Sequence, residues 1–165
     1  MLTLTKSLLE EPGIRRLISG IDAGTCPAVV SGLSEIHRAH IASVIRAATM
    51  RPIAVICSAE DECERLASDI CSLTMEQAVT INAREYLFHS VEVASHQIEQ
   101  RRVASLTALT ENRAPIVVMS ISGALQRTMP PEYLKEASQT LVIHKEYILD
   151  DIVNKLLICG YSRSG

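Results

Sequence analysis

The sequence predicts an α/β fold in which helices flank a parallel β-sheet. Short, uninterrupted apolar runs alternate along the chain with longer segments of helical periodicity, which is typical of βαβ units. These runs lack the alternation of polar and apolar residues that marks half-exposed strands, so each strand is expected to be buried on both faces. Hydrophobic residues make up 47% of the chain and aromatic residues only 3%, so the core must be aliphatic.

Five apolar runs are expected to form strands. They cover residues 28–30, 52–60, 78–82, 114–120 and 140–144. Seven helical segments lie between and around these runs. The first covers 6–19 and is interrupted at Pro12-Gly13, the second runs from Ile36 and ends before Arg51-Pro52, and the third is capped by Ser58. The others are 93–111, a short helix after Ser120, a helix from Pro131, and 147–160. In the last helix, an apolar stripe predicts an inward face made of Leu149, Ile152, Val153, Leu156 and Leu157.

A shift in composition near Thr128–Pro131 predicts two domains. We expect an α/β body over residues 1–127, followed by the start of a smaller α/β subdomain over 128–165 that is incomplete.

Bulk charge argues against a nucleic-acid or membrane surface. The formal net charge is −3, from 16 basic and 19 acidic residues, so no overall basic field attracts polyanions. Paired arginines such as Arg101-Arg102 are expected on solvated helix faces. The first residues are too polar for a secretory signal, and no apolar run approaches the ~20 residues of a membrane span. We therefore expect a cytoplasmic protein.

Cysteine and histidine residues give no strong metal or nucleophile pattern. Three of the five cysteines lie in apolar patterns and are expected to be buried thiols: Cys57, Cys63 and Cys71. His37 and His40 lack a third ligand, so they are expected to be a surface pair rather than a metal site. Cys159 and His144 form a conceivable nucleophile–base pair with no orienting group, and Cys159 is expected in the core. No metal and no catalytic residue are predicted.

The segment Gly32–Ala39 lies where a phosphate-binding loop would join a strand to a helix. Its first glycine, Gly32, is present. His37 replaces the second glycine, Arg38 replaces the lysine, and Ala39 lacks the hydroxyl that would bind Mg²⁺. Glu35 adds a negative charge where phosphate would lie. The loop is therefore expected to be degenerate, with no nucleotide cofactor.

Two further segments carry polar residues. Ser120 and Ser122 lie at the end of the strand at 114–120, where an ATPase would place acidic metal ligands, and are expected to cap the next helix. Charged and polar residues farther upstream are expected to form an ion network that fixes a loop: Arg84, Glu85, Glu92, Ser95, Glu99 and Arg102.

The spacing of these residues resembles the N-terminal UvrB-like module of the bacterial transcription-repair coupling factor family (Mfd). The family pattern is P-A-R-E, then E-x-x-S-x-x-x-E-x-x-R, a strand, A-L-L-Q and P-P-x-x-L. The matching residues are Ala83, Arg84, Glu85, Glu92, Ser95, Glu99, Arg102, Ala124, Leu125, Gln126, Pro130, Pro131 and Leu134. Asn82 replaces the first proline. The resemblance extends over nearly the whole chain.

The resemblance implies a degenerate P-loop NTPase-like fold, similar to UvrB domain 1a, that no longer binds ATP. It implies a non-catalytic docking module in transcription-coupled nucleotide excision repair, which binds UvrA and restrains its parent, an ATP-dependent DNA translocase. Contacts with RNA polymerase and DNA would belong to other domains of the parent. Arg163 matches an arginine of the UvrA interface, but the strand that carries further contacts is missing from these residues. UvrA binding by this chain is therefore expected to be weak or absent.

The alternative interpretation is a nucleotide-binding fragment of a UvrB-like ATP-dependent DNA helicase. Arg38, at the position of the P-loop lysine, is its only support in the sequence.

Overall fold

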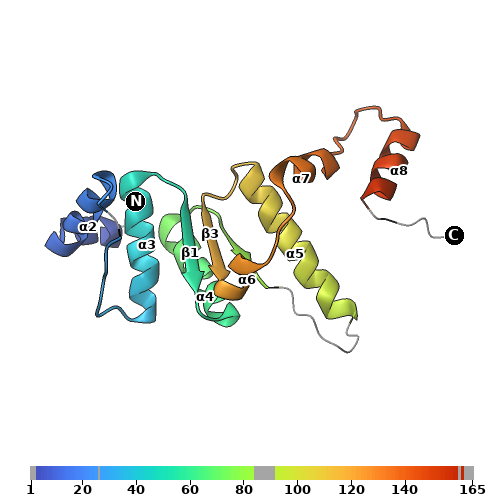
Figure 1. The fold of residues 1–165 in the computed structure, drawn as a ribbon. Helices are drawn as coiled ribbons and strands as arrows, with labels where there is room; N and C mark the ends of the chain where they lie inside the picture. Colours follow the sequence, from blue (N-terminus) through green and yellow to red (C-terminus); the bar gives the residue numbers. More distant parts are fainter. Residues whose placement is uncertain (1–2, 26, 84–91, 160, 162–165) are drawn as a thin grey trace. The chain divides into compact units, whose positions relative to one another are not determined.

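The computed structural model describes residues 3–25, 27–83, 92–159 and 161, and the side chains of 3–4 and 92–96 lie outside the description. The elements are α1 (Thr3–Glu10), α2 (Pro12–Asp22), α3 (Glu35–Thr49), β1 (Ile53–Cys57), α4 (Glu60–Thr74), β2 (Ala78–Ile81), α5 (Glu92–Thr110), β3 (Ile116–Ser120), α6 (Ile121–Leu125), α7 (Pro131–Ala137) and α8 (Leu149–Ile158) (Figure 1). They form two compact units, Met1–Gln126 and Arg127–Gly165. The assignment of domains 1–127 and 128–165 to a UvrB domain 1a-like fold and a UvrA-binding-like subdomain stays a prediction.

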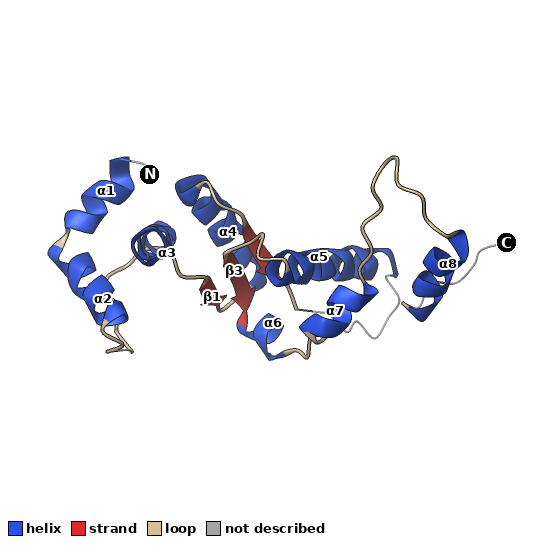
Figure 2. Ribbon diagram, turned by 90° about the horizontal axis from the view of Figure 1, so that it is seen from above, coloured by secondary structure: helices blue, strands red, loops and turns tan. Residues whose placement is uncertain are grey.

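The first unit contains a three-stranded parallel sheet, so the predicted α/β class is confirmed. Its strand order is β1-β3-β2, with Ile53 and Ala78 both in register with Ile116. Figure 2 shows the three strands between α4 and α5. The central strand β3 is buried along most of its length, as its continuous apolar run predicts. The expectation that each strand is buried on both faces was wrong for β1, in which partly buried and exposed residues alternate before Cys57.

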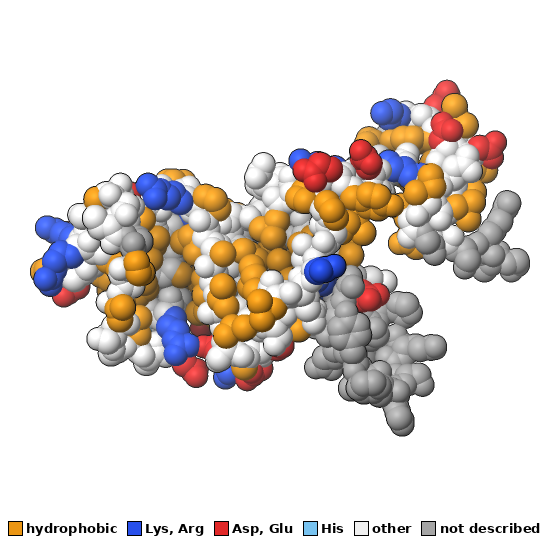
Figure 3. Space-filling model, in the orientation of Figure 1, with side chains coloured by type: hydrophobic (Ala, Val, Ile, Leu, Met, Phe, Trp, Pro, Cys, Tyr) orange, Lys and Arg blue, Asp and Glu red, His pale blue; other side chains and the backbone are white. Residues whose placement is uncertain are grey.

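Each face of the sheet has its own apolar cluster. One cluster joins α3 and α4 to the sheet through residues such as Ala39, Ile70 and Val118, all fully buried. The second joins α5 to β2 and β3 and includes Ala108 and Val117. Over β1 this second face is open: Ile56 is 60% exposed, and Figure 3 shows hydrophobic side chains gathered over the middle of this unit.

Two predicted strands are absent from the described structure. Residues 28–30 lie in irregular chain between α2 and α3, with Val29 exposed. Residues 140–144 end in a turn in which Lys145 N donates to Val142 O (3.3 Å), and His144 has a positive φ of 67°. An apolar run forms a strand only where a neighbouring strand takes up its backbone hydrogen bonds, and neither run has one here.

In the second unit, the expectation of a buried apolar face on the last helix was wrong. Helix α8 has the predicted amphipathic pattern, but none of its residues is buried. Cys159, expected in the core, is also exposed. Lys155 Nζ donates to Ser138 O (2.9 Å), and Cys159 Sγ donates to Ala137 O (3.7 Å), so polar contacts hold the end of α8 to α7.

Candidate functional site

The residues of the predicted degenerate loop make contacts with their own chain. Ser34, the residue before α3, donates from its backbone N to His37 Nδ1 (3.3 Å), and its Oγ lies 3.0 Å from the same nitrogen. Gly32 has a φ of +76°, which glycine adopts without strain. His37, at the position of the second P-loop glycine, thus helps to cap α3.

Arg38, at the position of the P-loop lysine, pairs with a carboxylate. Its Nη1 donates to Glu62 Oε1 on α4. Glu62 Oε2 in turn accepts from Ser58 Oγ (3.0 Å), at the carboxyl end of β1. Ser58 was predicted to cap α4, but the N-cap is Ala59, and Ser58 holds Glu62 instead. The guanidinium therefore faces an internal anion where a P-loop lysine would face phosphate.

The other two residues differ in burial. Ala39 is completely buried in the cluster between α3 and α4, whereas Glu35 is exposed in the first turn of α3. A carboxylate in the first turn already complements the positive end of the helix dipole. His37 thus helps to cap a helix, Arg38 forms an ion pair and Ala39 fills the core. The lack of a nucleotide role for the predicted loop stays a prediction.

Arg163, the predicted UvrA contact, lies outside the described residues. The same holds for Arg84 and Glu85 of the family motif.

A second polar cluster lies at the carboxyl ends of β2 and β3. Ser120 Oγ donates to Glu60 Oε1 and accepts from Gly123 N (2.8 Å), which confirms Ser120 as the cap of α6. Ala83 N donates to the same Glu60 oxygen (3.0 Å). Arg102, only 2% exposed, donates from Nη1 to Asn82 O (2.7 Å). The cluster ties α4, α5 and α6 to the ends of the strands.

Gly123 is required by a close backbone approach. A Cβ at this position would lie 2.5 Å from Ile81 O, a distance that real Cβ atoms do not show. Arg102 Nη2 also lies 3.5 Å from Gly123 O. The chain can pass this close to β2 only without a side chain at 123.

The cluster is suited to structure rather than to anion binding. Glu60 Oε2 and Asn82 Oδ1 are buried acceptors for which the described structure gives no donor. A phosphate at this edge would meet the Glu60 carboxylate and the amide oxygen of Asn82, and both would repel it. Sequence reasoning predicted the cap at Ser120 but missed Glu60 and Gly123, for which the Ser-Gly pair after a buried strand was the available signal. The expected solvated position of Arg102 was wrong, because its side chain is buried against the end of β2.

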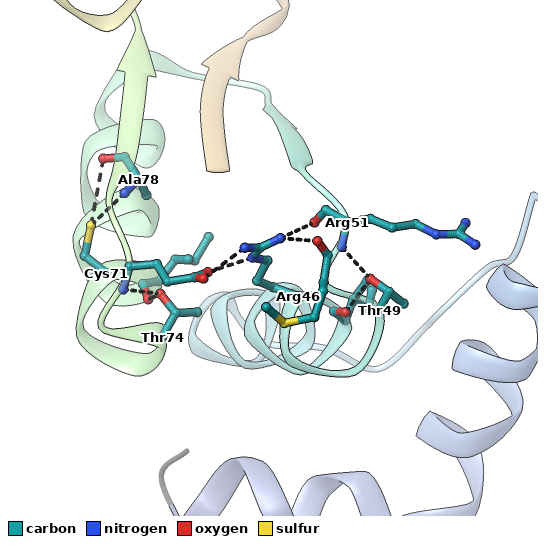
Figure 4. Close-up of polar contacts among 10 residues, drawn as sticks. Arg46, Thr49, Arg51, Cys71, Thr74 and Ala78 are labelled. Atoms are coloured by element: carbon teal, nitrogen blue, oxygen red, sulfur yellow. Dashed lines mark hydrogen bonds and ion pairs between the residues drawn. The ribbon is translucent and has the colours of Figure 1, made fainter. Parts of the chain in front are cut away.

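A third cluster joins the carboxyl ends of α3 and α4 (Figure 4). Arg46 donates to both oxygens of Glu76, from Nε to Oε2 (2.7 Å) and from Nη2 to Oε1 (2.9 Å). Its Nη1 also donates to Arg51 O (3.0 Å). Hydrogen bonding to Arg46 lowers the pKa of Glu76 below its ordinary value. Each of these two helices is followed by a methionine with a positive φ, Met50 at 56° and Met75 at 60°.

The described thiols and histidines show no reactive pairing. Burial raises the pKa of Cys57, and burial followed by a hydrogen bond with Cys57 raises the pKa of Cys63 to about 12. Thiols of this kind are inert at neutral pH. His40 Nδ1 contacts Ile36 O (2.9 Å). Among the described residues, no cluster of three His, Cys, Asp or Glu side chains could hold a metal ion.

Comparison with curated proteins identifies the class to which the chain is similar. Over 157 residues it is 27% identical to the transcription-repair-coupling factor of Bacillus subtilis, a match that covers 94% of this chain and 13% of the relative. The corresponding factors of Staphylococcus haemolyticus and Staphylococcus aureus are 24% and 21% identical over 82% and 85% of the chain. The resemblance predicted from the sequence motifs is therefore confirmed.

The chain spans only 12–13% of the length of these relatives. No family model and no solved structure matches it. Among the described helices, none is both long and apolar enough to cross a membrane.

Proposed function

We propose that this chain is a non-catalytic N-terminal module of a transcription-coupled nucleotide excision repair factor. In this proposal the module docks UvrA and restrains the parent ATP-dependent DNA translocase. The module itself binds no nucleotide and hydrolyses none. RNA polymerase and DNA are partners of other domains of the parent, and the protein works in the cytoplasm.

The observation that carries the proposal is the match to transcription-repair-coupling factors over 94% of this chain. The contacts of the degenerate loop support the non-catalytic part. Arg38 is paired with Glu62, and Ala39 is fully buried, so neither offers a free group to phosphate or Mg²⁺.

Calorimetric titration with ATP–Mg²⁺ tests the nucleotide part. We expect no heat of binding and no rise in the melting temperature of the 165-residue chain with ATP. Because a ligand that binds the native state raises its stability, saturable binding at micromolar affinity would favour the helicase-fragment alternative. In that case Arg38→Ala should abolish the ATP-dependent shift.

A chimera tests the restraining part. In the Bacillus subtilis relative, the 157-residue matching segment is either deleted or replaced by residues 1–165. We expect deletion to raise ATP hydrolysis and the replacement to bring it back toward the level of the intact relative. Equal ATP hydrolysis in the deletion and the chimera would contradict restraint by this module.

UvrA docking is tested separately with the purified 165-residue chain on a biosensor. We expect weak or absent binding, and any residual signal should fall with Arg163→Ala. Tight binding that is insensitive to this substitution would contradict the predicted contact.

A further inference from the structure

A cavity of about 200 Å³ lies in the first unit, where α1 packs on α3 beside the carboxyl end of α4. Each helix contributes to its lining: Thr5 from α1, Ser43 and Ala47 from α3, and Leu73 from α4. It lies near the carboxyl end of α3, whereas the predicted degenerate loop lies at the amino end. Because a protein cavity of about 150 Å³ can hold benzene, this one is large enough for a ligand of that size.

Two hydroxyl groups in the lining are buried. Thr5 is 5% exposed, and no hydrogen bond among the described residues reaches its side chain. Ser43 is 2% exposed, and its Oγ donates to Ala39 O (2.7 Å), so the oxygen can still accept a hydrogen bond. A buried hydroxyl without a partner costs stability. A ligand that supplies a partner to Thr5 therefore binds here with a polar contact as well as an apolar one.

The charged groups of the cavity neutralise each other. Arg46 donates to both carboxylate oxygens of Glu76 (2.7 and 2.9 Å), as Figure 4 shows. An anion in the cavity would meet the Glu76 carboxylate, and a cation would meet the Arg46 guanidinium. Thr74 Oγ1 already donates to Ile70 O (2.8 Å) and accepts from Glu76 N (3.2 Å). The ion pair therefore disfavours a charged ligand of either sign.

The rest of the lining is apolar. Ala47 and Leu73 are partly buried aliphatic residues, and they favour an apolar ligand body. Met50 also lines the cavity and is 65% exposed, so the cavity opens to solvent on the side of this flexible side chain.

We propose that this cavity binds a small uncharged molecule that carries one hydroxyl group on an apolar body, as in a phenol or a short alcohol. The ligand hydroxyl donates to Ser43 Oγ and accepts from Thr5 Oγ1, and the apolar body packs on Ala47 and Leu73. The ligand contacts three helices at once, so its binding stabilises the position of α1 on α3 and α4. This site is independent of the docking role proposed above.

NMR titration of the 165-residue chain with phenol tests the proposal. We expect saturable shifts of the Ser43, Ala47 and Leu73 amides, with a Kd of about 1 mM. Benzene, which lacks the hydroxyl, and benzoate, which is charged, should each bind at least about fivefold more weakly than phenol. Thr5→Val should weaken phenol binding about fivefold and leave benzene binding within about twofold, because it removes only the hydroxyl contact.

The matched control is Thr107→Val on α5, which removes a hydroxyl outside the cavity and should leave phenol binding unchanged. Ala47→Met fills the cavity and should abolish the binding of both phenol and benzene, while an unchanged urea midpoint shows that this variant is folded. The absence of saturable shifts in the unmodified chain would overturn the proposal, since only water would then enter the cavity. Phenol binding that survives Thr5→Val, or that benzoate matches, would also overturn it.

Discussion

The start of α3 and the junction between β3 and α6 are both polar segments at the carboxyl edge of the sheet, yet they are built differently. At the first, the Arg38 side chain is 53% exposed where it pairs with Glu62 of α4, and His37 contacts the nearby Ser34. At the second, Ser120 and Arg102 are each 2% exposed, and Gly123 is pressed against β2. We therefore expect a substitution at Arg38 to cost the fold little and a change in the buried junction to cost much more.

This contrast bears on how freely the residues of each segment can change. Buried polar groups must keep all their partners, since an unmatched group costs stability. An exposed side chain such as Arg38 carries no such constraint, so it can be replaced while the sheet stays intact. The predictions below test this contrast, from the largest effect to the smallest.

Arg102→Met should have the largest effect. It leaves the carbonyl of Asn82 without its buried donor, so we expect a loss of about 3 kcal/mol in the free energy of unfolding, measured by urea denaturation. The matched control is Arg101→Met on the same helix, where the side chain is 72% exposed and the expected loss is below about 0.5 kcal/mol. Equal losses would remove the distinction between the buried cluster and the surface.

Gly123→Ala should follow closely. The added methyl would lie 2.5 Å from Ile81 O, so the β3–α6 junction must shift, at an expected cost of about 2 kcal/mol. Thermal unfolding measures the effect. At Gly13, where an added Cβ meets nothing within 4 Å, alanine should instead be neutral or stabilising.

Glu76→Gln probes a pair of intermediate exposure, with Arg46 and Glu76 side chains 12% and 32% exposed. We expect a loss of about 1 kcal/mol at pH 7. Because Arg46 lowers the folded-state pKa of Glu76 below its ordinary 4.5, the stabilisation is present above that value. It is lost as the pH falls through the folded-state pKa.

The difference between wild type and Glu76→Gln should therefore shrink below about pH 4. Denaturation midpoints at pH 7, 5 and 3 measure it. Glu111→Gln is the control, because the Glu111–Arg113 pair is exposed on both sides. A pH-independent difference at Glu76 would show that its charge is not what stabilises the fold.

Arg38→Ala should have the smallest effect, below about 0.5 kcal/mol, because the Arg38 side chain is half-exposed and solvent screens its pair with Glu62. Arg65→Ala, which breaks the exposed pair with Asp61, should match it in chemical denaturation. A loss in the free energy of unfolding at Arg38 as large as that at Arg102 would show that the Arg38–Glu62 pair is needed for the stability of the fold.

The central strands could be predicted from sequence, and the outlying ones could not. Residues 53–57, 78–81 and 116–120 form strands because each apolar run has a neighbour in the sheet. The runs at 28–30 and 140–144 have similar composition, but whether they pair depends on contacts far along the chain. The stripe of α8 failed for the same reason, since an amphipathic helix is buried only where something packs on it.

In the candidate sites, too, contacts that are local in sequence could be predicted and contacts between distant segments could not. Ser120 was predictable because capping is local in sequence. Glu60 was missed because its partners, Ala83 and Ser120, come from distant segments that only the fold brings together. The pairing of Arg38 with Glu62 was missed for the same reason, although each residue alone was visible in the sequence.

The complete burial of Ala39 limits which side chains position 39 can hold. A serine or threonine there adds atoms to a space already filled between α3 and α4, at a cost of about 1–3 kcal/mol. A hydroxyl at this position would therefore weaken the packing of the two helices before it could contact any ligand.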